Sequence, residues 1–206
     1  MKSALTAIAA TLPSGHGWIG AWSPGIGDPT FVGWFTVVAY IAAVAFCWQV
    51  RRTLSVGPND PRRERRFWLA LALALLFLGI NKQLDLQTAF TETMRTLARR
   101  QGWYENRFEY QIAFIAGMTF LLPVGIWLCF RVARGMPTSV KTAGAGLVVI
   151  ACFVLIRAAS FHHVDRLLGE TVLLLKLNWL LELGGIAVVL VGASWRLRQL
   201  RSKGVA

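Results

Sequence analysis

Five long apolar stretches alternate with short polar or basic segments along the chain. Each stretch holds about twenty residues, and about twenty helical residues match the roughly 30 Å hydrocarbon core of a bilayer. The pattern predicts an all-α integral membrane protein, with a bundle of five transmembrane helices in residues 31–195. The expected spans are 31–50, 67–87, 108–130, 143–161 and 172–195.

The two ends of the chain differ from this bundle. Residues 1–30 precede it, and from residue 13 to residue 33 the chain is rich in Gly and Pro, which disfavour a long helix, and contains Trp, which favours the headgroup level of a membrane. We interpret them as an uncleaved arm that rests on the membrane surface, with a cleaved signal peptide in residues 1–12 as the alternative. Residues 196–206 are expected to form a basic tail.

Basic residues gather on one side of the predicted bundle. Residues 51–66, 131–142 and 196–206 hold thirteen of the 22 Lys and Arg and two of the ten acidic residues, and so carry +11 of the net charge of +12. Five spans put the two termini on opposite sides. The positive-inside rule then predicts a cytoplasmic C-terminus and a periplasmic N-terminus. Charge placed between apolar runs is a topology signal, so we expect no nucleic-acid partner.

Composition supports the membrane class and excludes some chemistry. Charged residues make up 16% of the chain, against about 25% in soluble domains. The three cysteines, Cys47, Cys129 and Cys152, lie in three different apolar stretches. They form neither a CxxC pair nor a disulfide framework, which excludes an iron–sulfur or structural zinc site built from them.

One polar stretch, GINKQLDLQT at residues 79–88, follows directly on fourteen apolar residues. Those fourteen residues cover about 21 Å as a helix, so the polar stretch is expected to begin below the membrane surface. Asn81, Asp85 and Thr88 have helical spacing and are expected to share one face. Residues 88–102 then predict either an amphipathic surface helix or an extension of the second span.

Under the predicted topology, this stretch meets two others, WYENRFEYQ and RAASFHHVD, and the start of the fifth span at the periplasmic end. Ionisable groups inside a membrane usually face the bundle interior and mark a ligand or proton path. The alternative is a network of ion pairs that only fixes helix packing. The candidate catalytic residues are Lys82, Asp85, Arg157 and Ser160, and the candidate ligand-binding residues are Asn81, Arg107, Glu109, Lys176 and Asn178.

His162, His163 and Asp165 are the candidate metal ligands, since imidazole and carboxylate together suit zinc. On a helix, His162 and Asp165 reach one ion, and Asp85 or Glu109 is the expected source of a third ligand. Bound zinc would lower the pKa of a water molecule, and Lys82 or Arg157 would stabilise the oxyanion. The spacing is not that of HExxH, and histidines that only donate hydrogen bonds at a helix interface are the alternative.

The stretches GINKQLDLQT, QGWYENR and SFHHVD resemble a family of bacterial multi-pass inner-membrane proteins over about residues 67–182. Members often carry the label isopropylmalate isomerase. The sequence does not support that label, because such isomerases are soluble and use a three-cysteine iron–sulfur site. The resemblance implies the bacterial inner membrane and no established activity.

A looser likeness links the chain to membrane hydrolases of the alkaline ceramidase superfamily, which use Ser, Asp and His around zinc. Ser160, His162, His163, Asp165 and Asp85 supply these residue types here. The seven spans and the HxxxH pair of that superfamily are missing.

Two functions therefore stand as hypotheses. In the first, the periplasm-facing polar site binds an amphiphile such as a lipid headgroup or quinone, with metal-assisted hydrolysis as a further step. In the second, the protein is a non-catalytic accessory subunit of a larger bioenergetic or photosynthetic membrane complex, and its polar clusters contact partner subunits. The expected partners are membrane lipids and, in the second case, other membrane subunits.

Overall fold

Within the residues that it describes, a computed structural model shows six helices and no strand. It describes residues 17–18, 22–54, 61–102, 107–160 and 171–202. Side chains are not described for residues 87, 107–108, 110–111, 114–115, 118, 156–160 and 171–178. The helices are α2 (Phe31–Thr53), α3 (Arg62–Leu84), α4 (Leu86–Gln101), α5 (Arg107–Ala133), α6 (Thr138–Ser160) and α7 (Thr171–Ser202).

Four segments of the described residues are long and apolar enough to cross a membrane, which confirms the all-helical membrane class. They are Phe31–Thr53, Arg62–Leu84, Thr138–Leu155 and Trp179–Ser202. The remaining predicted span, the third at 108–130, corresponds to α5, which is 27 residues long. Only its part Thr119–Ala133 is a continuous apolar helix among the described residues.

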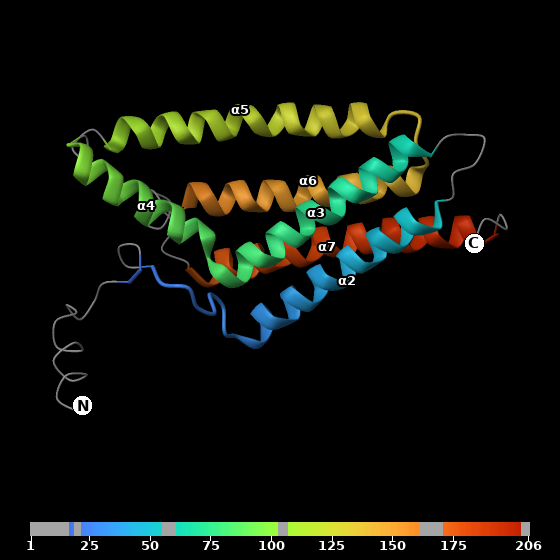
Figure 1. Cartoon of the computed structure of the whole chain (residues 1–206), viewed down its shortest axis with the longest axis horizontal. Helices are drawn as coiled ribbons and strands as arrows, with labels where there is room; N and C mark the ends of the chain where they lie inside the picture. Colours follow the sequence, from blue (N-terminus) through green and yellow to red (C-terminus); the bar gives the residue numbers. More distant parts are fainter. Residues whose placement is uncertain (1–16, 19–21, 55–60, 103–106, 161–170, 203–206) are drawn as a thin grey trace, which may run out of the picture.

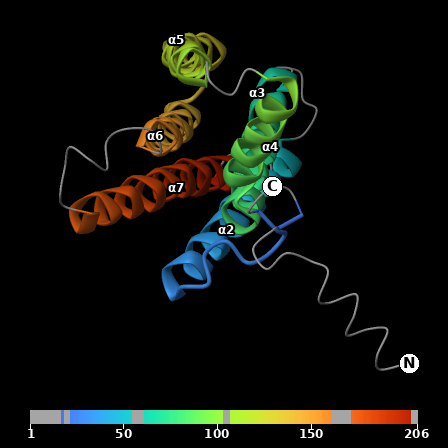
Figure 2. The ribbon, with the colours of Figure 1, turned by 90° about the vertical axis from the view of Figure 1, so that its left-hand side faces the viewer.

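The long helices form a row in the order α3, α2, α7, α6 and α5, in which each helix packs against the next (Figures 1 and 2). The end of α2 and the start of α3 lie beside the end of α5, the start of α6 and the end of α7 (Figure 1). We call this the basic end, because residues 51–54, 61–66, 131–142 and 196–202 meet there. The opposite end, where α2 begins and α3 ends, is called the polar end.

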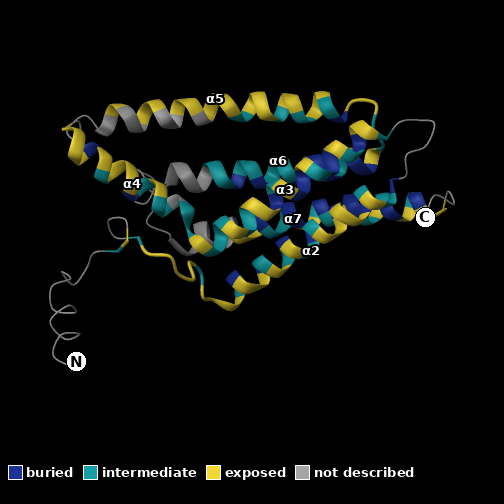
Figure 3. Ribbon diagram, in the orientation of Figure 1, coloured by how far each residue is buried: buried dark blue, intermediate teal, exposed yellow. Residues whose placement is uncertain are grey.

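The core lies where α2, α3, α6 and α7 meet, and buried residues gather there toward the basic end (Figure 3). α2 contributes a stripe at helical spacing, Thr36, Tyr40, Ala43, Cys47 and Val50. Its other positions are mostly exposed, as expected for helix surface that faces lipid. Among the described helices, α5 packs extensively only on α6, and its described part is largely exposed (Figure 3).

Glycines let α6 and α7 approach closely. A Cβ at Gly146 would lie 2.7 Å from the Gly185 carbonyl oxygen, and a Cβ at Gly192 would lie 2.6 Å from the Ala143 nitrogen. Small residues at such crossings are typical of membrane helix pairs. Gly184, by contrast, has open space at its Cβ position.

The second predicted span, 67–87, ends earlier than expected. α3 stops at Leu84, Asp85 takes the left-handed conformation with φ 47°, and α4 starts at Leu86. The Asp85 amide still donates to the Asn81 carbonyl, and the Thr88 amide donates to the Asp85 carbonyl. α4 is therefore a separate helix that bends away from α3 (Figure 1), so it does not extend the second span.

The predicted basic tail is helical where it is described, because α7 continues to Ser202. The Arg196 guanidinium in this part donates two hydrogen bonds to the Glu64 carboxylate of α3, from Nε at 2.7 Å and from Nη2 at 2.8 Å. The indole of Trp68 also donates to Glu64. This bidentate pair fixes the end of α7 to the start of α3.

Candidate functional site

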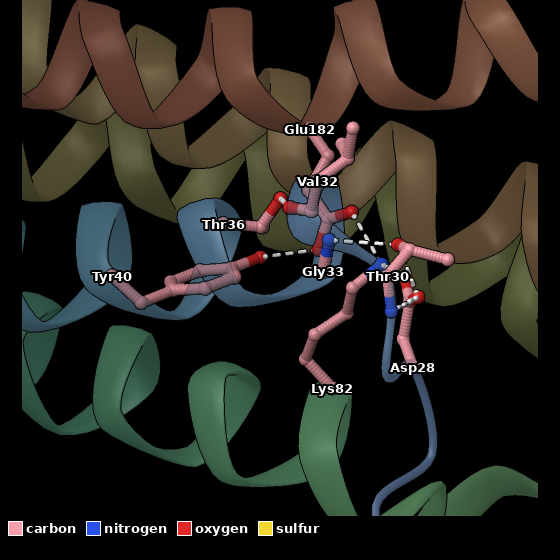
Figure 4. Close-up of polar contacts among 8 residues, drawn as sticks. All are labelled: Asp28, Thr30, Val32, Gly33, Thr36, Tyr40, Lys82 and Glu182. Carbon is pink, nitrogen blue, oxygen red and sulfur yellow. Dashed lines mark hydrogen bonds and ion pairs between the residues drawn. The ribbon is translucent and has the colours of Figure 1, made fainter.

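The polar end contains a buried ion cluster centred on Lys82 near the end of α3. Its Nζ lies 3.3 Å from Asp28 Oδ2 and 3.4 Å from Glu182 Oε2 of α7. The Tyr40 hydroxyl of α2 donates to Glu182 Oε1 at 3.2 Å. Figure 4 shows Lys82 between the two carboxylates. α3, α7 and the segment before α2 thus meet at one ammonium group, and α2 joins them through the bond from Tyr40 to Glu182.

The cluster is well shielded from its surroundings. The exposed fraction of the side chain is 3% for Glu182 and 7% for Lys82, while Asp28 keeps 24%. Charged groups at this depth are costly unless they are paired. Because Lys82 is shared by two carboxylates, its removal would leave both of them near each other without their cation.

Asp28 also stabilises the N-terminus of α2. Its Oδ1 accepts hydrogen bonds from the Thr30 amide and hydroxyl, and the Thr30 hydroxyl oxygen accepts one from the Gly33 amide (Figure 4). Thr30 is therefore the N-cap of α2. Burial alone would raise the pKa of Asp28, but the hydrogen bonds from Thr30 and the nearby Lys82 ammonium outweigh it and lower the pKa below 3.8.

We call residues 22–30 the strap, because they cross the end of α3. The Gly27 amide donates to the Gln83 carbonyl at 2.7 Å, and the Trp22 indole donates to the Leu84 carbonyl at 3.1 Å. The last carbonyls of a helix have no partner within it, so the strap satisfies two of them at the break. A Cβ at Gly27 would lie 3.0 Å from the Gln83 carbonyl oxygen, which explains a glycine here.

The side chain of Gln83 differs from the other polar groups of this cluster, which have hydrogen-bond partners. Both polar atoms of its side-chain amide are buried and have no hydrogen-bond partner among the described residues. An unpaired buried amide costs about 1–3 kcal/mol. Such a group either is strained scaffold or marks the place of a polar ligand atom.

The structure uses the other residues of the GINKQLDLQT stretch differently from the sequence-based prediction. Asp85 Oδ2 accepts a hydrogen bond from the Thr88 hydroxyl at 2.7 Å, so these two residues do meet. They meet across the break between α3 and α4, however, and not along one continuous helix. Among the described residues, Lys82 pairs with Asp28 and Glu182 and forms no ion pair with Asp85.

The remaining predicted site residues are only partly described. Glu109 lies exposed in the first turn of α5. Arg107, Arg157, Ser160, Lys176 and Asn178 lie in helices, but their side chains are outside the description. His162, His163 and Asp165 lie outside the described residues altogether. Within the described part, no group of three or more His, Cys, Asp or Glu side chains is placed to hold a metal ion.

Sequence reasoning missed Asp28 and Tyr40 as members of this cluster. Asp28 was hidden in a loop-like segment, although Asp-Pro-Thr directly before a long apolar run is a helix-start signal. Tyr40 is the single Tyr in the first span, which contains no charged residue. A phenol inside a span needs a hydrogen-bond partner, and that need was the available signal.

The fold and the cluster together indicate a helical membrane protein whose polar residues hold several helices together. Compared with protein-family models, curated proteins and solved structures, the chain matches none of them. The resemblance through GINKQLDLQT, QGWYENR and SFHHVD therefore stays a prediction.

Proposed function

We propose that the protein crosses the bacterial inner membrane five times, with α5 as the additional span. At 1.5 Å per residue the 27 residues of α5 cover about 40 Å. The basic end would face the cytoplasm and the polar end the periplasm. Arg51 stacks over Trp48 at 4.7 Å and Arg131 over Trp127 at 5.2 Å at the basic end, a pairing suited to the headgroup level.

We infer that the protein acts as a non-catalytic subunit of a larger membrane assembly. The observation that carries this inference is the pairing of Lys82 with Asp28 and Glu182, because it commits the most deeply buried charges of the polar end to one another. A catalytic or ligand-binding lysine needs a face open to its substrate. Here the ammonium holds α3, α7 and the strap together.

α5 supplies the surface for a partner helix in this proposal. Its exposed side chains are large and apolar, with Phe120 at 70% and Phe130 at 64% of full exposure. Among the described helices, α5 packs extensively only on α6, so most of the described surface of α5 is open to lipid or to another membrane helix. Trp127 and Leu128, both more than half exposed, lie on this surface as well.

Amphiphile binding remains the second candidate, and the unpaired amide of Gln83 is the observation that favours it. A lipid headgroup or quinone oxygen at the polar end would satisfy this amide. Gln83→Leu separates the two readings. In a scaffold it removes an unpaired group and should raise stability by about 1–3 kcal/mol, whereas in a binding site it should remove a copurified lipid or quinone that mass spectrometry detects.

The subunit proposal is tested by a double-mutant cycle on Lys82 and Glu182. Lys82→Met leaves two carboxylates without their cation, so it should destabilise the detergent-solubilised protein by about 3–5 kcal/mol. The double variant Lys82→Met/Glu182→Met should lose less than the two single variants together, because the pair is removed as a unit. Lys141→Met, at an exposed position of the basic end, is the control.

If Lys82→Met melts at the temperature of the wild-type protein but loses a copurified lipid or quinone, the scaffold interpretation is rejected. Metal analysis of the purified protein adds an independent measurement, since bound zinc would support the hydrolase form of the second candidate.

A further inference from the structure

α4 has two chemically different faces, and large side chains on each of them are exposed, although Glu92 on the polar face is buried. Phe90, Met94 and Leu97, spaced at four and three residues, form an apolar stripe in which the side chains keep 40–50% of their full exposure. Arg95, Arg99 and Arg100 are exposed as well. With 100° between successive residues, Arg95 and Arg99 lie opposite the stripe, and Arg100 lies at its edge.

The position of α4 suits neither a span nor a packed core helix. Its 16 residues cover about 24 Å, which is short for a bilayer, and they include three arginines. α4 starts at the break at Asp85 and runs obliquely away from the end of α3, toward the start of α5 (Figure 1). Among the described helices it packs on α3 alone to any extent.

We propose that α4 binds the surface of the membrane at the polar end, with anionic phospholipid as its partner. The stripe of Phe90, Met94 and Leu97 enters the boundary between headgroups and acyl chains. The arginines contact lipid phosphates, Arg100 from the edge of the stripe and the others from the polar face. An apolar stripe with a basic opposite face is the pattern of helices that lie in the interface.

Charge complementarity selects anionic lipid over an apolar partner. α4 carries three arginines against one acidic residue, Glu92, and Glu92 is buried and paired with Arg95 at 2.6 Å. The outward charge of the helix is therefore positive. The same contact accounts for three arginines on the side where the positive-inside rule expects few, because their charge would be held at the lipid surface. The inference rests on membrane insertion of the bundle but not on the proposed orientation or subunit role.

The experiment is amide hydrogen exchange of the full chain in nanodiscs of phosphatidylcholine, alone or with phosphatidylglycerol. Anionic lipid should slow exchange in residues 86–101 about tenfold or more, since each basic residue near an anionic surface contributes roughly a factor of five. High salt should reverse this slowing. The triple variant Arg95→Gln/Arg99→Gln/Arg100→Gln should lose it.

The matched control is Arg52→Gln/Arg66→Gln/Arg134→Gln, which removes the same charge from exposed positions at the basic end. It should keep the full slowing in α4. Met94→Ser/Leu97→Ser should speed exchange in α4 in both lipid mixtures. Equal exchange of α4 in both mixtures, or slowing that follows protein concentration, as a protein partner would cause, overturns the proposal. Protection of α2 and α7 in the same samples reports membrane insertion separately.

Discussion

Asp85 shows how a single residue changes the polar end. It is the one residue other than glycine with positive φ among the described residues. Asp tolerates this left-handed conformation better than most residues. Its carboxylate accepts a hydrogen bond from the Thr88 hydroxyl and so stabilises the start of α4. The break ends α3 and gives α4 its own direction.

The effect of a substitution at Asp85 on stability should depend on the backbone conformation more than on the charge of the side chain. Asp85→Asn keeps the hydrogen bond and tolerates positive φ, so we expect a change below about 0.5 kcal/mol. Asp85→Val forces a β-branched side chain into the left-handed region and should cost about 1–3 kcal/mol. Thermal melting in detergent compares the two. A strong loss for Asp85→Asn would instead indicate a cationic partner beyond the described side chains.

Asp28 gives the polar end a dependence on pH. Its folded pKa lies below the usual 3.8, so its stabilising effect is complete above about pH 5 and is lost as the pH falls through the folded pKa. Wild-type protein should melt above Asp28→Asn at pH 7, and the difference should shrink toward pH 3. Melting both proteins across this range cancels the titration of other carboxylates. A constant difference would contradict the role of the charge.

Only part of this site could be predicted from the sequence. The stretch containing Lys82 stands out because polar residues follow a long apolar run, and Glu182 stands out as an acid inside a span. The pairing of Lys82 with Asp28 and Glu182 could not be predicted, because Asp28 lies 54 residues and Glu182 lies 100 residues from Lys82 along the chain. Helical periodicity relates residues within one helix and does not choose among several cations and acids on different helices.

At the scale of the helices, the crossing of α6 and α7 depends on which glycine faces the partner. Gly185→Ala would place a Cβ 2.6 Å from Ile150 Cγ1 and 3.1 Å from the Gly146 carbonyl oxygen, and should cost about 1–3 kcal/mol. Gly184→Ala is the control on the same helix. It meets open space and should raise helix stability by roughly 0.5–1 kcal/mol. Equal melting of the two variants would contradict the close crossing.

The sequence predicts the existence of the helices better than their ends. Long apolar runs impose helix formation in a membrane because the backbone must bond to itself. The described parts of the predicted spans lie in α2, α3, α5, α6 and α7, except residues 85–87, which form the break and the start of α4. The ends differ where local contacts decide. α3 starts five residues before the predicted span at Phe67, because Glu64 binds Arg196 and Trp68. Counting these charges only as topology signals hid that pair.

Over the whole molecule, two polar clusters hold opposite ends of the same helices. Lys82 joins α3 to α7 at the polar end, and Arg196 joins α7 to α3 at the basic end. Between them the helices pack through apolar and small residues, whose contacts are not directional. The two clusters therefore set the register of α3 and α7, although the row places α2 between them.

The orientation of the whole bundle is the remaining prediction. Residues 51–66, 131–142 and 196–206 carry thirteen basic and two acidic residues, and their described parts lie at one end (Figure 1). Retaining this end in the cytoplasm is favoured by the positive-inside rule. Arg95, Arg99 and Arg100 oppose this bias, but there are only three of them against thirteen.

A reporter fused after Ala206 should therefore be active in the cytoplasm. A cysteine introduced in residues 166–171 should react with a membrane-impermeant maleimide on intact cells whose outer membrane is permeable to it. Arg134→Cys, exposed at the basic end, should react only after the inner membrane is opened. The wild-type protein corrects for Cys47, Cys129 and Cys152. The reverse pattern would place the Lys82 cluster and α4 on the cytoplasmic side, where the three arginines of α4 would add to the positive-inside charge and no longer oppose it.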